Sequence, residues 1–547
     1  MSETIFLQLT RLGDCLQSTV LISSWRVRYP EDRIIVLSSP AFAAAFKGNP
    51  DIDELLVCDP PPDHPSSIAA SLESPVSPLF SLIESLKKRK FRAVINLTHD
   101  QFSSRLTTLL RWDFLRGFTL DTQGKTTVTD LWSLYLLSFQ KFRSLNLLNL
   151  VDIFAHFSGA SAVRDRPRFE IDDQIRFEVA QWVKAIEPGR CFIGFQPGSS
   201  KAERRWPAEN FVQLGRELTM RHKANILVFG TENEEPLTRS ISDQIPNAQS
   251  FAGKTTLPQL AALLEKCQVL VTNDTGTMHL AAAVGIPNVA LFETSAYFRE
   301  TGPYGSGHWI IQSRQLLKYG APLGDEPEMI QRIPVESVLT AVEAIMSHDT
   351  KLPALIDPDP QADHYISMWT DGVVDYLPVM PVPLRLEDLC ARFQKPIWLA
   401  SLNNLPVNPD QAADEALEMI KTNYSETSGP ILSEMIQHCL KDTETTQRLL
   451  LKLNDLLEIS LQKVRKNPAH CFSADQLSKI TAREDALIRS GSNQAVQPFV
   501  SFFEIASAIV SGTTAREILI NYNRNVNVLN KQLNAFRAVL RSADTKV

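Results

Sequence analysis

The sequence predicts an α/β fold with two Rossmann-like halves and an all-helical extension. Short apolar runs alternate with helical stretches from the N-terminus, the alternation restarts near Cys191, and the pattern after residue 350 is helical with almost no strand signal. We therefore expect an N-terminal domain at residues 1–185, a second Rossmann-like domain at 186–350, and a linker with a helical extension of unknown role at 351–547.

Composition and charge exclude several classes of function. The 547 residues carry a net charge of −7, so no basic excess indicates binding to nucleic acid. The seven cysteines are scattered singly, without a CxxC pair or a metal-ligand spacing, as in a reduced cytosolic protein. No secretory signal begins the chain, and no stretch is apolar over the roughly 18 residues that span a bilayer. We expect a cytoplasmic protein, with contact to a membrane surface left open.

The first half starts with strand, loop, helix and strand, the order of a doubly wound parallel sheet. Its first helix is expected to begin near Leu16, and the Pro/Ser-rich segment 60–78 is interpreted as a loop or a mobile flap. The expected strands lie at residues 4–9, Ile34–Leu37, Asp53–Asp59 and Phe91–Leu97.

The second half repeats this alternation, which favours parallel βαβ units. Its expected strands lie at Cys191–Gln196, 225–230, 248–253, 268–274 and 288–293. Its expected helices begin near Pro207, at 257–267 and at 279–285.

The region after residue 350 begins with a Pro/Asp-rich linker at 351–365 and continues with apolar positions at helical spacing. A small basic cluster at Leu461–Pro468 is compatible with contact to anionic lipid or with a solvated helix end. The expected helical stretches are 409–424, 431–440, 446–466 and 525–543.

A polar turn joins a strand to a helix in the stretch VTNDTGTMHLAAAVGIP, Val271–Pro287. If the helix starts near Thr277, the backbone N–H groups of Thr275, Gly276 and Thr277 are unpaired donors where the helix dipole favours an anion. This predicts a phosphate-binding turn. The alternative is that Asp274 or Thr275 simply caps the helix.

A second strand-to-helix loop, PGSS at Pro197–Ser200, follows the strand that ends at Gln196. Because the carboxyl ends of parallel strands lie at one edge of the sheet, this loop and the phosphate-binding turn are expected to face one ligand. Arg204 follows closely, and its guanidinium suits phosphate oxygens. The alternative is a solvated basic loop. We interpret the nearby Trp206 as a packing anchor rather than a platform for a sugar.

In the first half, RLGDC places Asp14 after the first strand and beside Gly13, which permits close approach of a ligand or a tight turn. Asp14 is expected to project between the halves, or else to be the N-cap of the helix near Leu16. Neither this loop nor PGSS contains G-x-G-x-x-G, which argues against a dehydrogenase.

Four blocks in series resemble glycosyltransferase family 9, the ADP-heptose:lipopolysaccharide heptosyltransferases, over residues 4–315. The resemblance implies a GT-B fold, with an acceptor-binding first half and a nucleotide-sugar-binding second half across a cleft. It implies inverting, metal-independent transfer of a heptose or related sugar from ADP-heptose to the lipopolysaccharide core or another envelope glycan, at the cytoplasmic face of the inner membrane and without a cofactor. The four blocks are RLGDCLQSTVLISSWRVRYP, PGSSKAERRWP, AGKTTLPQLAALLEKCQVLVTNDTGTMHLAAAVGIPNVALF and TGPYG.

The resemblance also assigns roles to individual residues. Asp14 falls on the proposed catalytic base of the family, and Arg204 on a lysine that contacts phosphate. Either Glu234 or Glu235, in GTENEE, is expected to meet the nucleotide ribose. The segment Leu291–Pro303 departs from the family's small, Gly-containing segment, which affects recognition of the base. The remaining donor-binding positions are Ser199, Ser200, Asp274, Thr275, Gly276, Thr277 and His279, the last through its backbone only.

Inverting transfer needs a base for the acceptor hydroxyl, for which Asp14 is the candidate, and stabilisation of the leaving diphosphate. We expect the turn at Thr275–Thr277 and Arg204 to stabilise this charge in place of a metal. The DPDPQAD segment, 357–363, has the spacing of a metal-binding DxD motif but is interpreted as a solvated turn in the linker.

Two other functions fit part of the pattern. A nucleotide-sugar 2-epimerase shares the two-half architecture, although RLGDC with NDTGTMHL favours the transferase. A catalytically idle sugar-nucleotide-binding scaffold, with the helical extension recruiting partners, is the other alternative, and the presence of Asp14 argues against it.

Overall fold

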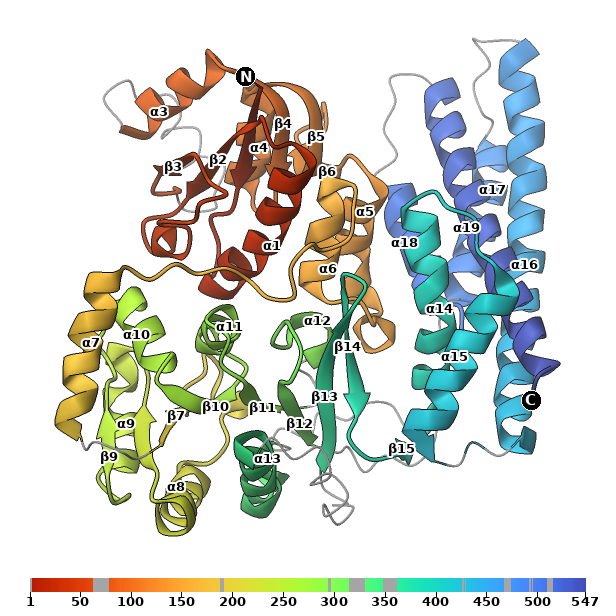
Figure 1. The fold of residues 1–547 in the computed structure, drawn as a ribbon. Helices are drawn as coiled ribbons and strands as arrows, with labels where there is room; N and C mark the ends of the chain where they lie inside the picture. Colours follow the sequence, from red (N-terminus) through yellow and green to blue (C-terminus); the bar gives the residue numbers. More distant parts are fainter. Residues whose placement is uncertain are drawn as a thin grey trace. The chain divides into compact units, whose positions relative to one another are not determined.

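The computed structural model divides into two units, drawn in Figure 1. The first comprises residues 1–115 and 148–380, and the second comprises 116–147 and 381–547. The residues that the structure describes are 2–61, 78–186, 191–293, 297–313, 330–347, 362–425, 427, 429–466, 474–490, 493, 495–508 and 515–547.

The first sheet has the strand order β3-β2-β1-β4-β5-β6. Strands β1 to β4 pair in parallel, and β6 runs antiparallel to β5. The predicted strands of this half are present, and β5 and β6 add to them. The strands are β1 (Glu3–Leu7), β2 (Arg33–Ser38), β3 (Glu54–Val57), β4 (Lys90–Asn96), β5 (Arg111–Leu120) and β6 (Thr126–Val128).

The helices of this half begin with α1, whose residues from Cys15 to Trp25 are all buried. Most of the Pro/Ser-rich segment, residues 62–77, lies outside the described residues. The helices are α1 (Leu12–Arg28), η1 (Ala43–Ala45), α3 (Pro78–Lys87), α4 (Gln101–Leu109), α6 (Leu150–Ala155) and η4 (His156–Ser158).

The second sheet has the order β14-β13-β12-β11-β10-β7-β8-β9. Counted from β7, the six parallel strands follow the order 3-2-1-4-5-6 of a Rossmann sheet. The strands are β7 (Phe192–Gln196), β8 (Asn225–Val228), β9 (Ala248–Ser250), β10 (Cys267–Asn273), β11 (Asn288–Phe292), β12 (Trp309–Ser313), β13 (Ala362–Thr370) and β14 (Val373–Pro378).

Strands β13 and β14 correct our expectation that the chain after residue 350 has almost no strand. They pair antiparallel with β12 and with each other, and so extend the second sheet. Alternating burial along β14 is the period-2 pattern of a strand, which the neighbouring Pro and Asp residues obscured. Residues 351–361 of the expected linker lie outside the described part.

Helices surround the second sheet, as Figure 1 shows. A hydrophobic cluster that includes Ile193, Trp206, Val271 and Leu339 joins strands to α8 and α13. The helices are α7 (Asp173–Ile186), η5 (Ala202–Arg204), α8 (Ala208–His222), η6 (Glu232–Glu234), α9 (Glu235–Ser242), α10 (Leu257–Leu264), α11 (Gly276–Ala283), α12 (Phe298–Thr301), η7 (Ile330–Arg332) and α13 (Val335–Ser347).

The second unit is mainly helical, as predicted for most of its length. Residues 116–147 belong to it because aromatic side chains of that segment pack on α14: Trp398 stacks on Phe142 and meets Tyr135 edge-on, with ring centroids 6.1 and 4.9 Å apart. The domain boundaries at 185 and 350 stay predictions. The elements of the second unit are α5 (Leu131–Ser138), η2 (Phe139–Lys141), η3 (Arg143–Leu145), β15 (Val382–Pro383), α14 (Leu386–Leu402), α15 (Pro409–Asn423), β16 (Tyr424–Ser425), α16 (Gly429–Lys466), α17 (Ala474–Ser490), α18 (Gln497–Ala508) and α19 (Ala515–Asp544).

No helix in the described part of the chain is both long and apolar enough to cross a membrane. The predicted basic cluster at Leu461–Pro468 falls partly at the end of α16, and residues 467 and 468 lie outside the described residues.

Candidate active site

Strand order places the candidate loops where a ligand binds in a doubly wound sheet. In the second sheet the order reverses between β7 and β10, which run side by side with Thr272 opposite Gln196. The loops after these two strands therefore leave the same edge of the sheet at the switch point, where ligands of this fold class bind. The loop after β1 occupies the equivalent point of the first sheet, between β1 and β4.

The predicted phosphate-binding turn leads into α11. Thr275 is the N-cap residue, in extended conformation, and within the described part of the chain its side chain makes no capping hydrogen bond. Capping by Thr275 is therefore wrong as an explanation of this turn. The N–H groups of the first helical turn have no carbonyl partner within the helix and are available to an anion. Thr277 Oγ1 donates instead to Gln196 Oε1 at 3.0 Å, which ties the turn to β7.

The loop after β7 meets this turn directly. Arg204 Nη1 lies 3.3 Å from Asp274 Oδ2, and both side chains are partly exposed. The loop is therefore more than a solvated basic segment, because the guanidinium of Arg204 is paired with Asp274, beside the amino end of α11. Ser199 is buried, and its Oγ has no hydrogen-bond partner among the described residues, whereas Ser200 is exposed. A buried hydroxyl without a partner is costly unless a ligand or water satisfies it.

The structure separates the two candidate ribose ligands. Glu234 lies against the loop after β7, since a Cβ at Gly198 would lie 1.9 Å from Glu234 Oε1. Its other carboxylate oxygen accepts from Thr231 N at 2.8 Å in a capping box. Glu235 instead pairs with Arg239 at 3.4 Å on α9. Only Glu234 is brought to the other site residues.

Asp14 lies in the first turn of α1, which begins at Leu12. The expected helix start near Leu16 was wrong, and so was the alternative that Asp14 is the N-cap: the N-cap is Arg11, which makes no side-chain capping bond within the described residues. Thr10 Oγ1 donates to Asp14 Oδ2 at 3.3 Å. Burial raises the pKa of Asp14, against the lowering effects of Arg11 and of the hydrogen bond from Thr10.

The amino ends of α1 and α11 contact each other. A Cβ at Gly13 would lie 2.7 Å from His279 Cδ2, and a Cβ at Gly276 would lie 3.2 Å from Leu12 Cδ2. The two glycines therefore allow a close approach that larger residues would prevent. As a result, the turn that bears Asp14 packs on the predicted phosphate-binding turn.

Two side chains near these turns, His279 and Trp206, are buried among other protein groups. His279 is buried, and its Nδ1 has no partner in the described part of the chain, so the expected bond to a carbonyl is not seen for that atom. Burial, and secondarily His308, lower its pKa to about 4, so the ring is neutral at pH 7. Trp206 is buried, donates from Nε1 to Ile333 O at 2.9 Å and packs edge-on against Phe211, which confirms a packing anchor.

Sequence reasoning missed Asn273 and Thr10. Asn273 is fully buried at the end of β10 and bonds to the loop after β7, and Thr10 bonds to Asp14. A polar residue that ends an otherwise apolar buried strand is a signal for Asn273, but no pattern distinguished Thr10 from an ordinary loop threonine. In the DPDPQAD segment, Asp363 is a buried residue of β13, and residues 357–361 are outside the described part.

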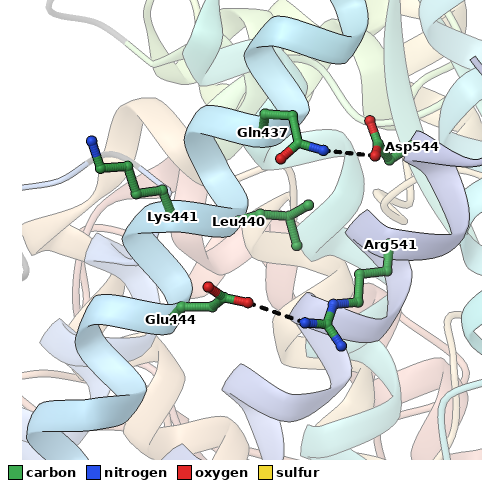
Figure 2. A pocket seen from close by; sticks show the side chains of 6 residues that line it. All are labelled: Gln437, Leu440, Lys441, Glu444, Arg541 and Asp544. Atoms are coloured by element: carbon green, nitrogen blue, oxygen red, sulfur yellow. Dashed lines mark hydrogen bonds and ion pairs between the residues drawn. The ribbon is translucent and has the colours of Figure 1, made fainter.

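A pocket of about 310 Å³ lies between α16 and α19 in the second unit, shown in Figure 2. Four of its polar side chains are paired across the two helices: Gln437 Nε2 donates to Asp544 at 2.7 Å, and Arg541 bonds to Glu444 at 3.1 Å. None of the predicted donor-binding residues lines it.

Comparison with known proteins agrees with the motifs. Residues 79–319 match the model of Glycosyltransferase family 9 (heptosyltransferase). The lipooligosaccharide heptosyltransferase 2 of Haemophilus influenzae is 36% identical over 109 residues, which cover 19% of this chain and only 31% of that relative. The lipopolysaccharide heptosyltransferase 3 of Escherichia coli is 23% identical over 364 residues, 62% of this chain and 97% of that relative.

The fold is also found among solved structures. The glycosyl transferase family 9 protein from Veillonella parvula superposes with a TM-score of 0.52 at 22% identity, over 64% of this chain and 98% of that one. This likeness confirms the fold, two Rossmann-like domains of the GT-B type, with the helical region as an addition. The motifs, the sheet order and the family match together identify residues 79–319 as a glycosyltransferase family 9 (heptosyltransferase) domain.

Proposed function

We propose that this chain is an inverting, metal-independent transferase that moves a heptose or related sugar from an ADP-sugar to the lipopolysaccharide core or another envelope glycan. The proposal is supported by the names of the relatives, which are lipopolysaccharide and lipooligosaccharide heptosyltransferases. The observation that carries it is the contact between the amino ends of α1 and α11, which packs a carboxylate-bearing turn on an anion-binding turn.

The donor diphosphate is proposed to bind at the amino end of α11. Its oxygens accept hydrogen bonds from the N–H groups at Gly276 and Thr277, where the helix dipole favours negative charge. Arg204 exchanges its bond with Asp274 for a charge-assisted bond to phosphate, and Ser199 Oγ gains the partner that it lacks. Glu234 is placed to accept from the ribose hydroxyls.

The negative charge on the leaving nucleotide grows as the bond between the anomeric carbon and the phosphate oxygen breaks. Fixed N–H dipoles and a guanidinium aimed at that oxygen stabilise the charge without reorganisation during the reaction. These groups would fill the role that a divalent cation has in metal-dependent transferases.

Asp14 is proposed as the general base. The acceptor hydroxyl attacks the anomeric carbon from the face opposite the diphosphate and transfers its proton to Asp14 as the new bond forms. The raised pKa of Asp14 makes its carboxylate a better proton acceptor than that of an ordinary aspartate. Thr10 orients the carboxylate through its hydrogen bond.

The nucleotide is the feature to test first. Thermal unfolding of the full chain is measured with ADP, UDP, GDP and their sugar conjugates, because a ligand that binds only the folded state raises the apparent stability. The proposal predicts the largest rise in Tm with ADP and ADP-heptose. A larger rise with UDP than with ADP would contradict the assignment of an ADP-sugar donor.

We also propose a peripheral location at the cytoplasmic face of the inner membrane, with a lipid-linked acceptor. Flotation of the full-length protein with vesicles of anionic and of neutral lipid tests this. Binding to the anionic vesicles alone, reversed by salt, is the expected result.

A further inference from the structure

Asn273 joins the two loops of the proposed donor site through a single buried side chain. The geometry points to Asn273 as a positioning residue for the donor diphosphate: its amide holds the loop after β7 and the segment before α8 against the turn before α11. This inference rests on the proposed function. It adds a residue that is not itself expected to touch the substrate.

The amide of Asn273 uses both its donor and its acceptor atoms on backbone groups. Nδ2 donates to Pro197 O at 2.8 Å and lies 3.4 Å from Gly198 O, and Oδ1 accepts from Trp206 N at 3.1 Å. The residue is 0% exposed. A buried amide with its groups satisfied fixes the relative position of the segments that it joins, because each lost bond leaves a buried polar group unpaired.

The residues joined in this way lie next to the proposed phosphate ligands. Asp274 follows Asn273, Ser199 follows the carbonyl groups that Asn273 holds, and Arg204 lies two residues before Trp206. The 3.3 Å contact of Arg204 with Asp274 therefore depends on two backbone segments that Asn273 connects.

Two further contacts make this connection rigid on the side of α8. Arg205 donates from Nε and Nη2 to Ser199 O, at 2.9 and 2.6 Å, which closes the loop on itself. Trp206 is anchored by its bond to Ile333 O and by Phe211. With both ends of the loop held, Asn273 is the side chain that sets its distance from the turn before α11.

Replacement of Asn273 by aspartate removes the N–H donor of the side chain and leaves the size of the side chain almost unchanged. An aspartate keeps an oxygen for Trp206 N but has no N–H group, and its second oxygen would face the carbonyl of Pro197. The loop after β7 is then expected to move away from the turn, which separates Ser199 and Arg204 from the N–H groups of α11.

Asn288 provides a matched control in the same sheet. It is also 0% exposed and its Nδ2 lies 3.4 Å from Ile286 O and 3.1 Å from His308 Nδ1. It is the first residue of β11, which runs parallel to β10, so it lies at the opposite edge of the sheet from the donor loops. N288D therefore measures the general cost of a buried carboxylate.

The experiment measures binding of ADP by calorimetry at pH 8 to the full-length wild type, N273D and N288D, with the urea midpoint of each. We expect the Kd of N273D to rise at least about 10-fold, as for the loss of a buried hydrogen-bonded donor, and that of N288D to stay within about twofold. In steady-state assays the donor KM of N273D should rise while the acceptor KM does not. An ADP affinity of N273D within twofold of the wild type would overturn the inference.

Other outcomes are also decisive. If N273D does not fold, N273A is measured by the same criteria, because alanine removes both side-chain hydrogen bonds without adding a charge. Unfolding of both Asn273 variants with a folded N288D would make the residue a requirement of the fold and would contradict a positioning role. If the wild type itself does not bind ADP, the proposed function fails, and this inference fails with it.

Discussion

The turns before α1 and α11 occupy equivalent places in the two sheets but differ in chemistry. Each follows a parallel strand at the switch point of its sheet, and each helix has an N-cap residue, Arg11 or Thr275, that makes no side-chain capping bond within the described residues. The first turn of α1 contains the acidic Asp14, whereas the first turn of α11 contains no acidic residue. The amino end of α1 thus carries a carboxylate of the protein itself, whereas the amino end of α11 is available to the anionic group of a ligand.

Under the proposed function, this difference would let a repeated fold element supply two catalytic functions. Other helices of the chain begin with a capping side chain, such as Asp100 for α4, Asn149 for α6 and Thr256 for α10. The amino ends of α1 and α11, whose N-cap residues make no such bond among the described residues, pack together through Gly13 and Gly276. The predictions below test whether the two turns differ as proposed, with the base on one and the leaving group on the other.

The largest effect is expected for Asp14→Asn. Without a general base, kcat should fall by about 10²- to 10⁴-fold, because proton removal from the acceptor is no longer assisted. The Kd of ADP should stay nearly unchanged, since the diphosphate binds at the other turn. Sugar transfer and calorimetric titration with ADP measure the two quantities. An equal loss of ADP binding would contradict the division between the turns.

The pH profile of the wild type sharpens this prediction. Only the ionised carboxylate accepts a proton, and burial raises the pKa of Asp14, so kcat/KM should rise with pH through a value above that of an ordinary aspartate. In D14N this acidic limb should be absent. An unchanged profile in the variant would assign the titration to another group.

The next largest effect is expected for Arg204→Ala, on the other turn. Loss of a charge-assisted bond to phosphate should raise the Kd of ADP by about 10- to 100-fold, with a smaller change in acceptor KM. Arg239→Ala is the matched control, because Arg239 is an exposed arginine of the same domain that pairs with Glu235. Equal ADP binding by both variants would remove Arg204 from the site.

A smaller effect distinguishes the two glutamates after β8. Glu234→Gln keeps an oxygen for the capping box but loses the charge, and should weaken ADP binding by about 3- to 10-fold if Glu234 accepts from the ribose. Glu235→Gln should bind ADP as the wild type does. The reverse order in a titration of both variants would assign the ribose contact to Glu235.

The smallest expected effect is on stability. Because burial raises the pKa of Asp14, the folded state binds this proton more tightly than the unfolded state does. The contribution of Asp14 to stability therefore falls as pH rises from the unfolded pKa through the folded one. D14N should have a Tm about 1–2 °C higher than the wild type at pH 7, and the difference should vanish near pH 3. A lower Tm of D14N at pH 7 would contradict an unfavourable buried charge.

Much of the fold could be predicted from local patterns. Apolar runs followed by polar turns located β1, β7 and β10, because buried parallel strands are continuously apolar. Strands β13 and β14 could not be predicted because they lie after a Pro/Asp-rich segment, and because their antiparallel pairing with β12 is a tertiary event. The packing of Tyr135 and Phe142 on Trp398 joins segments more than 250 residues apart, which no periodicity encodes.

The positions of the candidate loops could be predicted from the sequence, but the contacts between their residues could not. Small and polar residues after β7 and β10 pointed to the two candidate donor loops, because such residues are unexpected beside buried strands. The helix start at Leu12 was missed, since the pairing of Gly13 with His279 and of Leu12 with Gly276 depends on two helices 260 residues apart in sequence. The choice between Glu234 and Glu235 likewise needed the position of Gly198.

The central claim is that the amino end of α11 and Arg204 stabilise the leaving diphosphate in place of a metal ion. The most direct measurement is the initial rate of sugar transfer by the full-length protein in excess chelator, and again after addition of Mg²⁺ or Mn²⁺. The account predicts the same rate in all three conditions. Loss of transfer in chelator that returns with either cation would contradict it.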